Sequence, residues 1–383
     1  MNLSLALILS TIVVTYAVPY PGLKFKEEVH VGPTEAVGSA DSTSWKLEGG
    51  VMKGDIGIRE QSDAADYYVF EEPVRGRDNG ENFVYPSGPI MQSMVRQIIS
   101  SLTVSNLQTY LHKFTSFNNR YYDSDTGKQA SDWLFDTISN IIVAGPSNAS
   151  ATVERFQHIW KQSSIIARFP GSRNGPITVL GAHLDSVNWE DEENAPSARA
   201  PGADDDGSGS ISALEAFRAL AAAGFQPLNA VEFHWYSAEE IDEGLLGSAA
   251  VVASYKKSGI ALKGMMQLDM TAYVKPGSQE IIGLVQDFTT SSLNGYTATL
   301  AAEYNNIPIK NAGECQFACS DHVSWNASGY PTTQPFEATV EDQNSLIHTS
   351  DDTTNAPGFS WTHMLEFSKL AIAFAVELGN ASV

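Results

Sequence analysis

Hydrophobic residues recur every three or four positions in several stretches of the chain, which is the spacing of one buried face of an α-helix. The stretches with this spacing are 90–114, 130–142, 210–223, 248–257, 291–304 and 362–378. Between them lie short apolar runs of strand length, at 164–169, 177–181, 230–236, 262–268, 280–285 and 333–336. Helices that alternate with such runs predict an α/β domain around a mostly parallel sheet.

The first 85 residues follow a different pattern. Residues 3–14 form an apolar run of signal-peptide length, and small residues follow at Thr15 and Ala17. We therefore expect residues 1–17 to be a signal peptide and the protein to be secreted to the extracellular space. Residues 18–85 mix charges with glycine and proline, which favours a propeptide over an ordered N-terminal extension. The catalytic domain is then expected to span residues 86–383.

The charge and composition of the chain limit the kinds of binding partner that we expect. The 383 residues carry a formal net charge of −22, so we expect no binding to nucleic acid or to an anionic membrane surface. No stretch after the signal peptide predicts a membrane span, and we expect a monomer. Cys315 and Cys319 are expected to form a disulfide in an oxidising compartment. The candidate glycosylation sites are Asn148, Asn326 and Asn380.

Three consecutive carboxylates, Asp204 to Asp206, lie between glycines. Their charges repel one another, and a multivalent cation offsets such repulsion. Further metal-type side chains follow predicted strands and so are expected at one edge of the sheet, where ligands bind in α/β folds. They are His183 with Asp185, then Glu239 with Glu240, and Asp269. His348 lies in a polar loop before the last helix and completes a set suited to two zinc ions with a base.

Asp185 lies two residues after His183 and is expected to accept the second N–H of that imidazole. A calcium-binding EF-hand loop is an alternative reading of the acidic stretch, because Asp204, Asp206, Ser208 and Glu215 fall at ligand positions. An EF-hand needs a helix that enters the loop, and the preceding Pro201 opposes one. The zinc reading is therefore preferred.

Six motifs occur in order and together resemble the secreted di-zinc aminopeptidases of the M28 family, notably the bacterial and fungal leucine aminopeptidases. They are Gly181-Ala182-His183-Leu184-Asp185-Ser186, Pro201-Gly202-Ala203-Asp204-Asp205-Asp206, Ser237-Ala238-Glu239-Glu240, Gln267-Leu268-Asp269-Met270-Thr271, Ala318-Cys319-Ser320-Asp321-His322 and Ile347-His348-Thr349. The resemblance runs from about residue 90 to the end of the chain. It implies a three-layer sandwich with a central, mostly parallel mixed sheet flanked by helices.

The resemblance also implies the roles. Asp205 is expected to bridge two Zn²⁺ ions, with His183 and Asp269 on one, and Glu240 and His348 on the other. Glu239 is expected to act as general base toward a bridging hydroxide. The implied reaction is hydrolysis of N-terminal residues, preferably apolar and leucine-like, from peptides with a free N-terminus.

Four residues are expected to line the substrate pocket, namely Met270, Phe317, Phe336 and Ile347. Phe317 stands between the cysteines where the resembled enzymes carry a tyrosine, so a hydroxyl that supports the tetrahedral intermediate is missing here. Gln334 and Gln343 also fall in a segment that is often bulky and apolar in those enzymes. The two glutamines oppose a plain preference for leucine.

Other functions remain to be weighed. A related hydrolase, such as a dipeptidase or carboxypeptidase, is the nearest alternative, although the sequence offers no arginine cluster for a substrate carboxylate. A metal-free binding module of the same fold is another, and the presence of all five expected ligands and the base opposes it. Glutaminyl cyclases share the sheet, but they typically use one metal ion.

Overall fold

The computed structural model describes residues 46–48, 51–53, 83–146, 150–241 and 244–382. The predicted signal peptide, most of the predicted propeptide and Asn148 lie outside the described residues. The chain divides into two units, Met1–Ala64 and Ala65–Val383. In the first unit, β1 (Lys46–Glu48) pairs with β2 (Val51–Lys53) in antiparallel fashion. All that follows concerns the second unit.

A six-stranded mixed sheet runs through this unit, in the order β10-β7-β5-β6-β4-β3. Its strands are β3 (Thr152–Phe156), β4 (Ser164–Phe169), β5 (Ile177–His183), β6 (Val231–Tyr236), β7 (Leu262–Gln267) and β10 (Thr332–Thr333). The pairs from β10 to β6 are parallel, whereas β4 and β3 join as antiparallel strands. The predicted mostly parallel mixed sheet is confirmed.

The run predicted as one strand at 333–336 divides between two sheets. β10 pairs with β7, whereas β11 (Pro335–Phe336) pairs with β8 (Ile282–Val285) in a second, three-stranded sheet. β9 (Ile309–Gly313) lies on the other side of β8. Between the two short strands, the backbone carbonyl of Gln334 accepts a hydrogen bond from the N–H of Val285. The segment therefore links the two sheets near their carboxyl edge.

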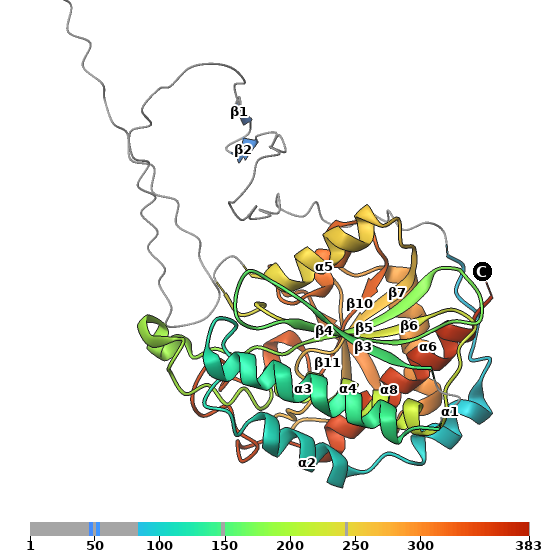
Figure 1. The fold of residues 1–383 in the computed structure, drawn as a ribbon, viewed down its shortest axis with the longest axis horizontal. Coiled ribbons are helices and arrows are strands. Elements are labelled where there is room, and N and C mark those ends of the chain that lie inside the picture. The colour runs from blue at the N-terminus through green and yellow to red at the C-terminus, as the bar shows by residue number, and fades with distance from the viewer. Residues whose placement is uncertain (1–45, 49–50, 54–82, 147–149, 242–243, 383) are drawn as a thin grey trace, which may run out of the picture. The chain divides into compact units, whose positions relative to one another are not determined.

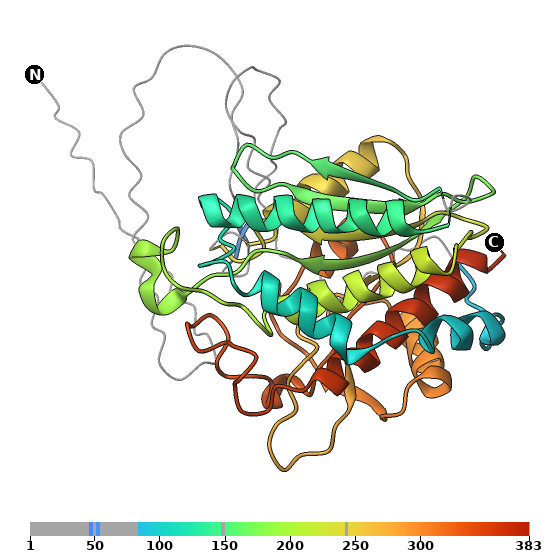
Figure 2. The ribbon, with the colours of Figure 1, turned by 60° about the horizontal axis from the view of Figure 1, so that its bottom comes forward.

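Helices cover both faces of the larger sheet (Figures 1 and 2). On one face lie α3 (Asp125–Ala144), α4 (Gly207–Ala222) and α8 (Trp361–Asn380), with α1 (Gln92–Ile99), α2 (Val104–Phe114) and α6 (Ser291–Tyr304) packed around them. On the other face lie α5 (Leu246–Lys257) and the short α7 (His322–Ala327). Two short 3₁₀ helices, η1 (Trp189–Asn194) and η2 (Val340–Asp342), lie in loops.

Alternation along the strands explains the two covered faces. In β5, Leu180 packs in the larger core cluster, whereas Val179 packs in the cluster beneath α5. In β4, Ile165 likewise packs in the larger core cluster, and Ile166 packs in the cluster beneath α5. Successive strand side chains point to opposite faces, so a strand that is buried on both faces reads as a continuous apolar run. Among the described residues, no helix is both long and apolar enough to cross a membrane.

Candidate metal centre

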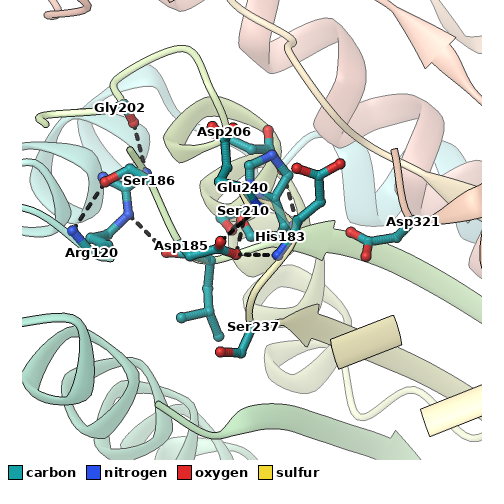
Figure 3. Close-up of polar contacts among 12 residues, drawn as sticks. Arg120, His183, Asp185, Ser186, Gly202, Asp206, Ser210, Ser237, Glu240 and Asp321 are labelled. Carbon is teal, nitrogen blue, oxygen red and sulfur yellow. Dashed lines mark hydrogen bonds and ion pairs between the residues drawn. The ribbon is translucent and has the colours of Figure 1, made fainter. Parts of the chain in front are cut away.

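The carboxyl ends of three adjacent parallel strands carry most of the predicted site. β5 ends at His183, and Asp269 follows β7 by two residues. Glu239 and Glu240 follow the end of β6 after a short turn. Parallel strands that are neighbours in the sheet bring their ends to one edge, and Figure 3 shows His183, Asp185 and Glu240 lying together there.

Two groups of possible metal ligands share the carboxylate of Asp205. One group is His183, Asp205 and Asp269, and the other is Asp205, Glu240 and His348; the ligand atoms within each group all lie within 4.8 Å of one another. Oδ1 of Asp205 lies 3.1 Å from Nε2 of His183. Its Oδ2 lies 2.9 Å from Nε2 of His348. One carboxylate therefore presents a separate oxygen to each group.

The remaining ligand distances are similarly short. Nε2 of His183 lies 3.6 Å from Oδ1 of Asp269, and Nε2 of His348 lies 3.0 Å from Oε2 of Glu240. Asp205, Asp269 and Glu240 are buried. In the described part of the chain, no lysine or arginine forms an ion pair with any of these three carboxylates.

The other two carboxylates of the acidic triplet bind backbone and side chains instead. Asp206 caps α4 by accepting the N–H of Gly209 at 2.9 Å, and it also accepts the N–H of His183 at 3.1 Å and of Met270 at 3.2 Å. Asp206 thereby ties the start of α4 to the ends of β5 and β7.

Asp204 points away from the ligand groups as well, because it accepts the N–H of Ala272 and the side-chain amide of Asn344. The helix that follows the acidic triplet excludes the EF-hand alternative. Two of the residues at calcium-ligand positions, Ser208 and Glu215, belong to α4, where Glu215 pairs with Arg218 at 2.6 Å. An EF-hand requires these positions to lie in a loop around calcium.

Asp185 anchors the two glutamates. Its carboxylate accepts the backbone N–H of Glu239 at 3.1 Å and that of Glu240 at 2.9 Å. Among the described residues, Nδ1 of His183 has no hydrogen-bond partner, and Oδ1 of Asp185 lies 3.7 Å away, within the range of an ion pair. The expected neighbours therefore meet without the expected hydrogen bond, and the carboxylate of Asp185 bonds the backbone at the end of β6 instead.

Charge couples the ligands strongly. Burial acts to lower the pKa of His183, but the carboxylates of Asp269, Asp185 and Asp205 outweigh it and hold the pKa well above its usual value. His348 is held high in the same way by Glu240 and Asp205. Burial acts to raise the pKa of Asp205, and the two imidazoles outweigh it and lower the pKa. The imidazoles and the carboxylates therefore stabilise one another's charged forms.

Glu239 has a distinct environment. Its side chain stays partly exposed, and it belongs to neither ligand group. Desolvation, with added repulsion from Glu240, Asp321 and Asp269, raises the pKa of Glu239 well above its ordinary value. A carboxyl group with a raised pKa at the open side of such a site suits proton transfer.

Backbone strain is concentrated at the same edge of the sheet. Ala238, Met270 and His348 adopt left-handed backbone conformations, with φ of 57°, 63° and 58°. His348 is a candidate ligand, Met270 follows the candidate ligand Asp269, and Ala238 precedes Glu239. Left-handed conformations of residues other than glycine cost of order 1–3 kcal/mol each and are retained where the surrounding structure imposes them. The surrounding fold therefore determines where these side chains point.

Sequence reasoning missed several buried groups that hold the site. Asp352 accepts the backbone N–H of Asp204 and of Asp205, the latter at 3.0 Å. Glu337 is buried beside Asp204 and accepts the N–H of Asn344. The position of Asp352, four residues after His348, was the available signal, because an acidic residue so close to a candidate ligand invites a supporting role.

Three of the four predicted pocket residues lie together, and Phe317 does not. Met270 and Phe336 are buried in one apolar cluster, against which Ile347 and Cys315 pack. Phe317 lies outside this cluster and is 48% exposed.

Cys315 and Cys319 form the predicted disulfide. Of the described sequons, Asn326 lies in α7 and Asn380 at the end of α8, both half-buried.

The residues present fit zinc. Zinc binds imidazole nitrogen and carboxylate oxygen, and catalytic sites take about three protein ligands for each ion. Each ligand group supplies one imidazole and two carboxylates, with Asp205 shared between the groups. The short contacts between their ligand atoms gather donors of the right kind in a buried place.

Comparison with known proteins agrees with this geometry. Residues 164–375 match the model of peptidase family M28. Leucine aminopeptidase 1 of Emericella nidulans is 42% identical over 317 residues, which cover 80% of this chain and 78% of that protein. Leucine aminopeptidase 1 of Coccidioides posadasii is 37% identical over 378 residues, which cover 95% of this chain and 92% of that protein.

A solved structure supports the same relationship. The crystal structure of the LapA aminopeptidase of Legionella pneumophila superposes with a TM-score of 0.71 at 31% identity. The match covers 79% of this chain and 78% of that one.

Proposed function

The chain belongs to peptidase family M28 and is a zinc-dependent exopeptidase, and from this premise we propose that it releases N-terminal residues, preferably apolar and leucine-like, from peptides. The observation that carries the proposal is the pair of ligand groups that share Asp205, with Glu239 beside them. The names of the fungal relatives support leucine as the preferred residue.

Each ligand group is proposed to hold one of two zinc ions. His183, Asp205 and Asp269 would hold one zinc ion, and Asp205, Glu240 and His348 would hold the second. Bound zinc supplies Lewis-acid polarisation of the scissile carbonyl and lowers the pKa of water. The other requirements of the reaction fall to the side chains around the site.

Glu239 is proposed as the general base. Its carboxylate would accept a proton from the attacking water and hold it until the C–N bond breaks. It would then donate that proton to the nitrogen of the leaving amine. The position of Glu239 supports this role, because its side chain is partly exposed, adjoins the proposed ligand Glu240 and belongs to neither ligand group.

The apolar cluster of Met270, Phe336 and Ile347 is proposed to receive the side chain of the N-terminal residue. Burial of apolar surface favours a leucine side chain over a small or charged one, by about 25 cal/mol for each Å² removed from water. The acidic surroundings of the ligands would also favour a protonated or metal-bound α-amino group.

Processing and export are proposed as well. Residues 1–17 would direct secretion, and most of residues 18–85 would be removed. The hydroxyl of Tyr85 donates to the carbonyl of Lys263 at 2.8 Å, and its ring stacks on Tyr296 at 5.5 Å. We therefore propose that cleavage falls before Phe83, which packs against Tyr85. N-terminal sequencing of the secreted protein would contradict this if the chain began at Val18.

The function is tested with 4-nitroanilides of leucine, alanine, aspartate and lysine, together with acetyl-leucine 4-nitroanilide and a peptide amide. The leucine substrate should be cleaved fastest, the acetylated one should resist cleavage, and the peptide amide should be shortened from its N-terminus. The same sample should contain two zinc ions per chain by elemental analysis. Release of C-terminal residues, or equal cleavage of the acetylated substrate, would refute an aminopeptidase.

A further inference from the structure

A single buried arginine joins the two segments that carry His183 and Asp205. Arg120 is 0% exposed and lies between α2 and α3. Its Nε donates to the carbonyl of Leu184 at 2.9 Å, the residue after His183. Its Nη1 donates to the carbonyl of Pro201 at 2.5 Å, shortly before the acidic triplet. Its Nη2 donates to the carbonyl of Gly202 at 2.9 Å (Figure 3). One rigid side chain thereby fastens the end of β5 to the loop that leads into α4.

The neighbouring backbone repeats this connection. The N–H of Arg120 donates to Oγ of Ser186 at 3.0 Å, and that hydroxyl donates to the carbonyl of Ala200 at 2.9 Å. Asn119 contributes through its side-chain amide, which donates to the carbonyl of Ala198 at 2.8 Å. The same two segments are therefore linked by the guanidinium and, independently, by the hydroxyl of Ser186.

Among the described residues, no carboxylate accepts a hydrogen bond from the guanidinium, although four carboxylates act on it through their charge. The charges of Asp352, Asp206, Asp185 and Asp205 act on Arg120, and they oppose the effect of burial, which lowers its pKa to about 10. Arg120 is therefore charged at neutral pH. Its bonds go to backbone carbonyls, and its charge lies behind the acidic ligands.

These two properties have opposite effects on a bound cation. A positive charge behind the site repels zinc and, alone, weakens its binding. Bonds that fix the ligand-bearing segments strengthen binding, because the ligands need less ordering when the ion arrives. Substitutions that remove the bonds, one with the charge and one without it, can therefore distinguish the two effects.

We propose that Arg120 is a positioning residue for the metal centre: it sets the separation of the His183 and Asp205 segments, and this effect outweighs its charge. The proposal rests on the zinc site of the proposed function and adds a residue to its supporting shell. Supporting residues of metal sites typically change metal affinity or activity by about 10–100-fold.

The test measures zinc affinity by competition with a chromophoric chelator, on full-length protein stripped of metal. The variants are Arg120→Gln, which removes the charge and most bonds, and Arg120→Lys, which keeps the charge but cannot span three carbonyls. Both should bind zinc about 10–100-fold more weakly than wild type. Arg96→Gln is the matched control, since Arg96 donates to the carbonyl and the carboxylate of Glu303 from an exposed position on α1 and lies outside both ligand segments. Its zinc affinity should stay within about twofold of wild type.

Two results would overturn the proposal. If Arg120→Gln binds zinc more tightly than wild type, the repulsion by the charge dominates. If both Arg120 variants melt at a lower temperature yet bind zinc normally, the arginine only stabilises the fold. Should these variants fail to fold, Ser186→Ala removes the parallel link between the same two segments with a much smaller change. Unaltered zinc affinity in that variant would refute the proposal that fixing these segments strengthens zinc binding.

The outcome is separable from the proposed function. If wild-type protein binds two zinc ions and releases leucine, the proposed function stands whatever the Arg120 variants do. If wild-type protein binds zinc but releases no N-terminal residue, the affinity comparison still decides the role of Arg120.

Discussion

The carboxylate of Asp185 accepts the backbone N–H of Glu240 at 2.9 Å. Its other oxygen accepts the N–H of Glu239, so one side chain from the end of β5 orients both glutamates at the end of β6. This relationship connects two strands at the level of the proposed metal centre, and it is the basis of the first prediction.

Replacement of Asp185 by asparagine should lower kcat/KM for a leucine substrate by about 10–100-fold. The amide keeps one acceptor oxygen, but its NH₂ group faces a backbone N–H that then has no acceptor. Activity and zinc content are measured together. Asp191→Asn, on the exposed η1, is the control and should leave both unchanged. Normal activity in Asp185→Asn would show that the anchoring is dispensable.

Replacement of Glu239 by alanine should reduce kcat by about 10²–10⁴-fold, the usual contribution of a general base. Zinc content should stay at the wild-type level, because Glu239 belongs to neither ligand group. Exposed Glu192, on η1, provides the control as Glu192→Gln. Near-wild-type turnover in Glu239→Ala would remove Glu239 from the proposed mechanism.

Removal of metal should abolish activity and lower the thermal midpoint of unfolding. Zinc that binds only the folded state stabilises it by about 2.7 kcal/mol at a free concentration 100-fold above its Kd. Dialysis against a chelator followed by calorimetry measures the loss. Added zinc should restore both properties, and added calcium should not. Full activity in metal-free protein would contradict the proposed chemistry.

Replacement of Ile347 by alanine should reduce the preference for leucine over alanine by at least about 10-fold in kcat/KM, because apolar groups that contact the leucine side chain are lost. Ile347 packs against the cluster that contains Met270 and Phe336. Ile159→Ala is the control, since Ile159 is 75% exposed. An unchanged ratio in Ile347→Ala would exclude this cluster as the pocket.

Stability should depend on pH through Lys263, which is remote from the metal centre at the start of β7. Burial lowers its pKa to about 8 from 10.5. Between these two values the unfolded chain binds the extra proton, so the free energy of unfolding should rise with pH. The measurement is denaturant unfolding of wild type and Lys263→Met from pH 7.5 to 10.5. A constant difference between the two proteins across that range would contradict the shifted pKa.

Local pattern was sufficient for much of the fold. Helix α6 and strand β4 begin and end where the periodicity predicts. Helix α3 begins five residues earlier than predicted, because Ser124 caps it by accepting the N–H of Gly127 at 2.8 Å. Among the described α-helices and β-strands of the second unit, three were missed. β3 is half-exposed and carries charged residues, β9 lies at a sheet edge, and α7 has six residues, so none buries enough apolar surface to produce a pattern.

The sequence by itself determined which residue types are available as ligands and that they follow strands, because strand ends and apolar runs are local properties. It did not distinguish the three aspartates of the triplet, since neighbours in sequence carry the same charge and spacing. Only the tertiary structure separates them: Asp206 bonds the ends of β5 and β7, Asp204 bonds Asn344, and Asp205 alone faces both histidines. The supporting roles of Arg120 and Asp352 also emerge only from the tertiary structure. The hydrogen-bond partners of these two side chains lie 60 or more residues away in the sequence and become neighbours only when the sheet assembles.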